Sequence, residues 1–439
     1  MSETNKDFKP TDWHSDEMNA RIKRRYRKEK TFKAFGLGAV VVAALFLVML
    51  IGKIASDGFF GFFQTSIELD IPFEQSVLGN PREMSPEAFQ EQVKRANMLR
   101  LIDAAMKEHF PEITNRRERR DLIRMVSTGA RGQLRDMILA NPTLVGTTKR
   151  VSLLASDDID QLHKGKIDKN EPEANRKVKD KELGWYNKLE EEGRVTLHFH
   201  STFLTHGDSR DPEMAGIWGA TVGSALTLVV TLLIAFPIGV LAAIYLEEFA
   251  PKNRLTDLIE ININNLAAVP SIVFGLLGLA VFLGVMHLPR SAPLVGGLTL
   301  ALMTLPTIII ASRASIKAVP PSIRDAARGL GASPMQVVFH HVVPLAMPGI
   351  LTGTIIGMAQ ALGETAPLLM IGMVAFIVDI PGSVTDAATA LPVQIFLWAD
   401  SPERAFVEKT SAAILVLLTF LIAMNGLAIW LRQKFERHW

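Results

Sequence analysis

The chain has 439 residues, a formal net charge of +2 and no cysteine. Its mean hydropathy of +0.22, together with 21% charged residues, is too apolar for one soluble enzyme and too charged for a pure membrane bundle. The near balance of 47 basic and 45 acidic residues predicts no nucleic-acid partner, and the lack of cysteine excludes disulfides and thiolate metal sites. We therefore expect a membrane protein that also carries a soluble part.

Six apolar segments reach the roughly 20 residues that a helix needs to cross the hydrocarbon core of a membrane. They are residues 34–52, 214–246, 261–289, 291–312, 344–378 and 410–431. The first follows a basic stretch, as the apolar region of a signal peptide would, but it is longer than such a region and no small-residue cleavage site follows it. We interpret it as a retained span and predict a mostly α-helical, polytopic membrane protein with six transmembrane helices.

The distribution of lysine and arginine predicts the orientation of these spans. Cations resist translocation, and basic residues gather before the first span, in the loop before residue 344 and after residue 431. Both termini are therefore expected in the cytoplasm. We predict a basic cytoplasmic N-terminus over residues 1–33 and a first transmembrane helix over residues 34–55. An extracytoplasmic, mainly helical insertion follows over residues 56–213. Residues 214–439 are predicted to form a five-helix membrane domain with a cytoplasmic loop at 319–345.

The insertion contains local signals for helices. Ser85-Pro86-Glu87 is typical of a helix start, with a capping serine and a proline in the first turn. A second helix is predicted over residues 119–139, with an interruption near Gly129. These signals favour a helical domain.

Two later features of the insertion are polar. Residues 157–192 are rich in charge and poor in large apolar side chains, so they are expected at the surface. His198 and His200 would share one side of a strand, and a zinc site there is conceivable. Because no further ligand cluster is nearby in the sequence, we interpret the two histidines as a solvated pair.

The cytoplasmic loop is the most informative segment of the chain. Pro320 and Pro321 end the preceding span, because proline lacks an amide donor and restricts the residue before it. Ser322 is then expected to cap a short helix with Asp325 at its third position, and Gly331 to weaken the end of that helix.

A second short helix is predicted in the same loop. Ser333 and Pro334 form its start, and Pro344 is expected to stop it. The first helix offers a small apolar face to the groove of a partner, made of Ile323, Ala326, Ala327 and Leu330. An ordinary interfacial loop that lies on lipid headgroups is the alternative.

The spacing from Asp325-Ala326-Ala327 through Gly331 to Pro344 resembles the EAA loop of ABC importer permeases, which holds a separate ATP-hydrolysing subunit. Asp325 stands where that family usually has glutamate, and His341 occupies an aliphatic position. The resemblance implies ATPase-coupling roles for Ile323, Asp325, Ala326, Ala327, Leu330, Gly331 and Pro344. The sequence contains no Walker A pattern, so ATP and Mg²⁺ are expected on a partner chain, and we expect no catalytic residue, metal site or cofactor here.

Two further stretches, residues 265–275 and 361–369, resemble signature segments of phosphate ABC transporter permeases of the PstA type. The resemblance covers residues 214–439, and the insertion is similar to that of an N-terminally extended subgroup. It implies a type I importer permease of the inner (plasma) membrane that forms the pathway for phosphate. The partners it implies are a second permease of the PstC type, two ATP-binding subunits of the PstB type, an external phosphate-binding protein of the PstS type, and membrane lipids.

Arg313 and Glu364 lie inside apolar segments, where a charge is costly unless it is paired or hydrated. Arg313 has the forked donors that bind an oxyanion, and Glu364 can accept a hydrogen bond from a protonated phosphate or hold Arg313 in a closed state. The alternatives are that Arg313 snorkels to the cytoplasmic surface and that Glu364 makes a structural hydrogen bond. The predicted substrate pathway consists of Arg313, Glu364, Thr365 and Gln360. Related permeases often carry arginine at the position of Gln360.

Other functions stay open at this point. A permease for phosphonate, sulfate or molybdate would carry the same coupling loop. A membrane-anchored sensor would use the insertion to bind a ligand, although nothing in the chain resembles a transmitter domain. A channel or secondary transporter would need no such loop.

Overall fold

The computed structural model describes residues 15–374 and 376–435, and the chain divides into two compact units, Met1–Ser56 and Asp57–Trp439. Residues 1–14 of the predicted N-terminal segment, residue 375 of the predicted fifth span and residues 436–439 lie outside the described residues. The first unit consists of most of helix α1 (Asp16–Phe59). This helix is long and apolar enough to cross a membrane, and its large apolar side chains over residues 35–51 are exposed, as expected of a helix that faces lipid.

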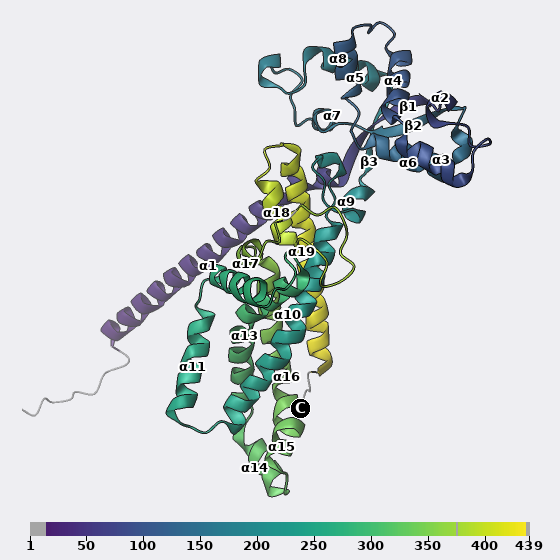
Figure 1. Cartoon of the computed structure of the whole chain (residues 1–439). Helices are drawn as coiled ribbons and strands as arrows, with labels where there is room; N and C mark the ends of the chain where they lie inside the picture. Colours follow the sequence, from purple (N-terminus) through teal and green to yellow (C-terminus); the bar gives the residue numbers. More distant parts are fainter. Residues whose placement is uncertain (1–14, 375, 436–439) are drawn as a thin grey trace, which may run out of the picture. The chain divides into compact units, whose positions relative to one another are not determined.

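The second unit begins with a domain built on an antiparallel three-stranded sheet in the order β2-β1-β3 (Figure 1). The strands are β1 (Phe63–Pro72), β2 (Thr148–Leu154) and β3 (Val195–Phe199). Along β1, Ile67, Leu69 and Ile71 are buried and alternate with more exposed side chains, the period of two that a half-buried strand requires. The central strand therefore supplies much of the core of this domain.

Helices surround the sheet. The helices and short 3-10 turns are η1 (Phe60–Phe62), α2 (Gln75–Leu78), α3 (Pro86–Arg95), α4 (Met98–His109), α5 (Arg116–Ile123), α6 (Ala130–Ala140), η2 (Pro142–Leu144), α7 (Asp157–His163), η3 (Glu173–Asn175), α8 (Asp180–Glu191), α9 (Ser201–Thr205) and η4 (Pro212–Met214). The predicted cap is confirmed, because the Ser85 hydroxyl accepts a hydrogen bond from the Ala88 amide at 3.3 Å. The predicted helix over 119–139 is two helices, α5 and α6, which separate near Gly129. Tyr186 and Leu189 are fully buried in α8, so the stretch 157–192 is not only surface material.

The membrane domain follows η4. Its elements, including three π-helical stretches, are α10 (Trp218–Ile244), η5 (Tyr245–Phe249), α11 (Arg254–Ala267), α12 (Ser271–Gly278), η6 (Leu279–Val285), α13 (Pro293–Lys317), α14 (Pro321–Gly329), α15 (Pro334–Gln336), η7 (Val337–Val342), α16 (Val343–Gly363), α17 (Ala366–Met370), α18 (Leu391–Ala399) and α19 (Ala405–Phe435). Helix α13 packs between α10 and α16, and α19 packs against α16 (Figure 1).

Small residues bring these helices close together. A Cβ atom at Gly297 would lie 2.5 Å from the Cβ of Val230, and one at Gly353 would lie 2.1 Å from the Cβ of Ala311. Both distances are far below van der Waals contact, so glycine is required at the α10–α13 and α13–α16 crossings. The helix axes can approach only because these positions lack a side chain.

Two of the predicted spans differ from simple crossings. Within the described residues, five helices are long and apolar enough to span a membrane, and α11 with α12–η6 makes a sixth if the pair counts as one span. This pair bends by 101° at its break, directly before Ser271, because Pro270 disfavours helix at the residue before it. The predicted span over 344–378 is shorter than expected, since α16 ends at Gly363 and the chain continues through the short α17.

Candidate functional site

The loop predicted to be cytoplasmic, residues 319–345, folds into α14, a tight turn and a second helix. Helix α14 begins at Pro321, with Pro320 as the flanking residue, so the predicted cap at Ser322 is wrong. Proline in the first turn has no amide to satisfy, and its fixed φ already suits a helix, so no side-chain cap is needed. After α14, Gly331 adopts a φ of +85°, a left-handed conformation that glycine takes without strain.

The second helix starts as predicted and ends much later than predicted. Ser333 and Gln336 form a capping box, in which the Gln336 side chain accepts from the Ser333 amide at 2.8 Å and the Ser333 hydroxyl accepts from the Gln336 amide at 3.4 Å. The prediction that Pro344 stops this helix is wrong, because helix continues through η7 into α16 as far as Gly363. Pro344 lies in the first turn of α16, directly after a π-helical stretch, where the regular hydrogen-bond pattern is already interrupted.

The structure divides the predicted apolar face of α14 into two sides. Ala327 is buried and Ile323 packs against the core formed by α10, α13 and α16. In contrast, Asp325 and Ala326 are exposed, and Leu330 is 90% exposed. The inner side holds α14 to its own membrane domain, and the outer side is free for a partner.

Arg324 attaches α14 to the ends of two membrane helices. Its guanidinium donates to Glu248 in η5 through Nε at 3.1 Å and through Nη2 at 2.7 Å. It also donates to the carbonyl oxygens of Val319 at 2.6 Å and Ile316 at 3.0 Å. Ile316 lies in the last turn of α13 and Val319 just beyond its end, where carbonyls lack the donors of a continuing helix, so one side chain both caps α13 and pairs with the end of α10.

Arg313 makes a second connection at the same end of the membrane domain. Its Nε lies 2.7 Å from an oxygen of Glu247 in η5, and its Nη2 lies 2.7 Å from an oxygen of Glu260 in α11. The side chains of Arg313 and Glu247 are 17% and 16% exposed, so each charge depends on the other for its stability in this environment. We call this set the arginine clamp, defined as Arg313, Arg324, Glu247, Glu248 and Glu260.

The proposed pairing of Arg313 with Glu364 is not present. Gly349 and Gly353 of α16 contact Ser315 and Ala311 of α13, which places Arg313 opposite the start of α16. Glu364 follows the end of α16, roughly 20 Å further along at 1.5 Å per residue. The geometry of α13 and α16 therefore prevents contact between Arg313 and Glu364.

The other predicted pathway residues gather at the end of α16. Glu364 is the C-cap of α16 and Thr365 is the N-cap of α17, both partly exposed, and Gln360 is exposed on the last turn of α16. Within the part of the chain that the structure describes, the Glu364 carboxylate makes no hydrogen bond or ion pair. The helix break thus presents a polar cluster between two apolar segments.

Sequence reasoning missed Arg324 and the three glutamates. Glu247 and Glu248 follow a long apolar segment, where the positive-inside rule favours lysine or arginine. Two acids at the end of a span that is predicted to carry lysine or arginine were the available signal, because buried carboxylates need cations nearby.

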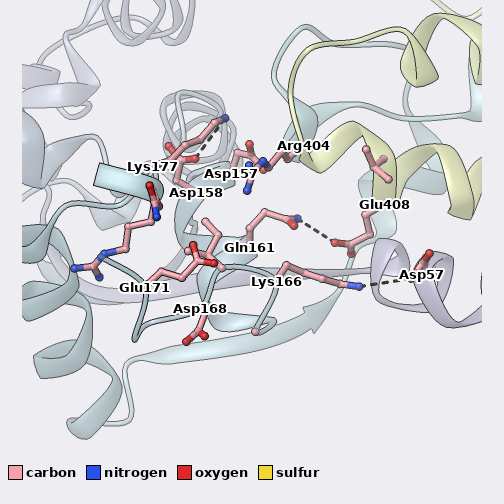
Figure 2. Close-up of a pocket in the computed structure, with 15 residues that line it drawn as sticks. Asp57, Asp157, Asp158, Gln161, Lys166, Asp168, Glu171, Lys177, Arg404 and Glu408 are labelled. Atoms are coloured by element: carbon pink, nitrogen blue, oxygen red, sulfur yellow. Dashed lines mark hydrogen bonds and ion pairs between the residues drawn. The ribbon is translucent and has the colours of Figure 1, made fainter. Parts of the chain in front are cut away.

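On the other side of the membrane domain, a cavity of about 400 Å³ lies between α7, the loop after it and the first turn of α19 (Figure 2). Figure 2 shows Gln161 donating to Glu408 and Lys166 facing Asp57, at 3.0 and 3.8 Å. Next to it, Lys164 is 1% exposed and pairs with Asp160 at 2.8 Å and with Glu408 at 2.7 Å. We interpret this region as the junction between the sheet-containing domain and α19.

The same junction buries His200. Its Nδ1 accepts from Lys409 of α19 at 2.9 Å, and the side chain lies inside the protein. Burial, reinforced by Lys409, lowers the pKa of His200 to about 2, so the imidazole is neutral. The interpretation of His198 and His200 as a solvated pair is therefore wrong for His200, because Lys409, distant in sequence, covers it.

Comparison with known proteins agrees with this architecture. Residues 235–437 match the family described as binding-protein-dependent transport system inner membrane component, and residues 19–173 match a domain of unknown function (DUF3333). The phosphate transport system permease protein PstA of Pasteurella multocida is 31% identical over 227 residues, which cover 51% of this chain and 78% of that protein. The chain belongs to the PstA family.

Two further similarities were found. PstA 1 of Mycobacterium tuberculosis is 29% identical over 49% of this chain and 70% of its own length. A solved structure of the inward-facing MetNI methionine ABC transporter matches 51% of this chain and 95% of that chain, at 16% identity and a TM-score of 0.40. As a member of the PstA family, the chain is a multi-pass permease subunit of an ABC importer in the inner membrane, a transport component and not an enzyme.

We predict that Arg324→Gln destabilises the membrane domain by about 2–3 kcal/mol, because it leaves the largely buried Glu248 carboxylate without its cation. Thermal unfolding of the detergent-solubilised chain measures this loss. Arg328→Gln is the matched control on the same helix, since Arg328 is 60% exposed and lies 3.8 Å from Asp325. Equal stability of the two variants would contradict the clamp.

The junction also predicts a pH dependence. Burial, together with the Asp158 and Glu213 carboxylates, raises the pKa of Asp157 from 3.8 to about 7. The folded state then binds more protons than the unfolded state between these values, so this group makes stability fall as the pH rises from about 4 to about 7. Asp157→Asn should remove a pH-dependent loss on the order of 2 kcal/mol, measured by thermal unfolding at pH 5 and pH 7.5.

The control for this prediction is Asp168→Asn, at an exposed aspartate that lines the same cavity. It should keep the pH dependence of the unmodified chain. If Asp157→Asn and the unmodified chain lose the same stability between the two pH values, the assignment to Asp157 is wrong.

Proposed function

We propose that the chain is the membrane permease subunit of an ATP-driven phosphate importer and that α14 receives the movement of a separate ATPase. The observation that carries the substrate is the similarity to several phosphate permeases over the half of the chain that holds the membrane domain. The partners in this proposal are a second permease of the PstC type, two ATP-binding subunits of the PstB type and an external phosphate-binding protein of the PstS type. Both termini lie in the cytoplasm in this arrangement.

The outer side of α14 is the docking surface in this proposal. Asp325, Ala326, Leu330 and Gly331 are exposed at one end of the membrane domain, with a large apolar side chain among them. A leucine that is 90% exposed at a helix end gains about 1.5–3 kcal/mol when a partner removes it from water. Ile323 and Ala327 hold α14 from its inner side, and Pro344 lies in the first turn of α16, where the loop rejoins the membrane domain.

The arginine clamp is the transmission element. A force on α14 acts through Arg324 on the ends of α10 and α13, and Arg313 joins α13 to α10 and α11. Breaking or moving these pairs changes how three membrane helices meet, which is the kind of rearrangement that alternating access requires. Because both of its donating sides face glutamate, Arg313 serves as a lock in this proposal and not as a phosphate ligand.

The phosphate pathway passes the break between α16 and α17. Glu364, Thr365 and Gln360 lie there, and the Glu364 carboxylate is available to accept a hydrogen bond from a protonated phosphate. A carboxylate repels a fully ionised anion, so this contact favours the protonated form.

Gly331→Val should abolish most phosphate uptake while the chain still reaches the membrane. Valine resists the φ of +85° at this position, so the turn that presents α14 must rearrange. Uptake of radiolabelled phosphate by cells that depend on this chain is the measurement, and co-purification of the ATP-binding subunit reports docking.

Gly329→Val is the matched control, because Gly329 has no unusual φ and a Cβ there meets nothing within 4 Å. Normal uptake and normal ATPase association in Gly331→Val would overturn the docking assignment. If unlabelled phosphonate, sulfate or molybdate suppresses this uptake more strongly than unlabelled phosphate does, the assignment of phosphate as the substrate is wrong.

A further inference from the structure

The extracytoplasmic domain contains a second, larger cavity, of about 750 Å³, which lies among α4, α5 and α6. Its volume falls in the range of roughly 300–1,000 Å³ that is typical of small-molecule sites. Six of the residues that line it are arginines: Arg100, Arg116, Arg119, Arg120, Arg124 and Arg131. Only two carboxylates, Asp103 and Glu213, share the lining.

Both of these carboxylates are already engaged. Asp103 receives both Nε and Nη2 of Arg119, which neutralises that one arginine. Glu213 is buried, accepts from the Ser127 hydroxyl at 2.6 Å, and has its pKa raised by burial. Neither acid can balance the charge of the other five arginines.

Those five arginines keep most of their charge unpaired. Within the residues that the structure describes, Arg100, Arg116, Arg120 and Arg131 have no carboxylate within 4 Å, and Arg124 has only Asp121 at 3.9 Å. A cleft lined by cations focuses a positive potential and attracts anions. The five side chains are exposed to water at this opening, so an anion can reach them and reduce the repulsion between their like charges.

We propose that this arginine-lined cavity binds a soluble oligophosphate, an anion that carries two or more phosphate groups. Guanidinium groups bind phosphate oxygens through two parallel hydrogen bonds, which makes arginine suited to this chemistry. Cations that come from three helices around a cavity of this volume fit several phosphate groups better than one. The proposal concerns the domain outside the membrane, so it does not depend on the proposed phosphate transport.

The floor of the cavity is connected to the first helix of the permease domain. Ser127 donates to Glu213 and Thr128 donates to Asp211, both at 2.6 Å, and a Cβ at Gly129 would lie 2.2 Å from the sulfur of Met214. These partners belong to the segment that leads into α10. An anion in the cavity therefore lies next to the connection between the two domains.

The test is calorimetric titration of the full-length chain, in nanodiscs of neutral phosphatidylcholine, with tripolyphosphate, pyrophosphate and orthophosphate. We expect tripolyphosphate to bind and orthophosphate to bind much more weakly. Arg116→Gln combined with Arg120→Gln should weaken tripolyphosphate binding by about tenfold or more, since each variant removes a charged hydrogen-bond donor. Arg117→Gln is the matched control, because Arg117 lies on the same helix and does not line the cavity.

In the neutral nanodiscs, any of three results would overturn the proposal. They are no binding of tripolyphosphate by the unmodified chain, an equal loss in Arg117→Gln, and equally tight binding of orthophosphate. A further titration uses nanodiscs that contain the anionic lipid phosphatidylglycerol. If this lipid occupies the arginines and tripolyphosphate does not displace it, the ligand of the cavity is a lipid headgroup and the proposal is wrong. If the double variant does not fold, Arg100→Gln with Arg131→Gln tests the same cavity from α4 and α6.

Discussion

A guanidinium group that leaves bulk water must be matched by a carboxylate, and this requirement organises one end of the membrane domain. Arg324 and Arg313 meet it with three glutamates, two of them in the π-helical extension of α10. The pairs join α10, α11, α13 and α14 at a place where apolar packing alone would leave the helix ends free to separate. Breaking one such pair costs much more than an exposed ion pair, because a charge is left without a partner in a region with little water.

The opposite end of the membrane domain uses the same chemistry. The first turn of α19 carries Glu408 and Lys409, which meet Lys164 and His200 of the sheet-containing domain. Between these two polar ends, the helices meet through small residues such as Gly297 and Gly353, which allow the helix backbones to approach closely. The membrane domain therefore combines close packing in its middle with ion pairs at both ends.

Much of the fold could be predicted because many of its signals are local. Apolar length fixes the spans, the Ser85 and Ser333 caps are read from three or four neighbouring residues, and the turn at Gly331 follows from glycine itself. Predictions failed where distant residues decide. His200 is buried by Lys409, more than two hundred positions away, and Arg313 meets Glu247 and Glu260 because of how α10, α11 and α13 cross.

Proline explains the other errors. The sequence predicts that Pro344 ends a helix. In the structure Pro344 lies in the first turn of α16, directly after a π-helical stretch, where its missing amide donor breaks no regular helical hydrogen bond. The break between α11 and α12 at Pro270 has the opposite outcome. Proline lacks an amide donor in both places. Whether the helix breaks depends on whether a regular helical hydrogen bond would otherwise form at that position.

We propose that the exposed tip of α14 is the contact point for an ATP-binding subunit. The chain has no cysteine, so a single Leu330→Cys substitution gives it one reactive thiol, to which a cross-linker can be attached before the transporter is assembled. We expect this thiol to capture the ATP-binding subunit, whereas Leu233→Cys, at an exposed position in the middle of α10, should not capture it. Absence of a cross-link at position 330 in an active transporter, or equal capture from position 233, would contradict it.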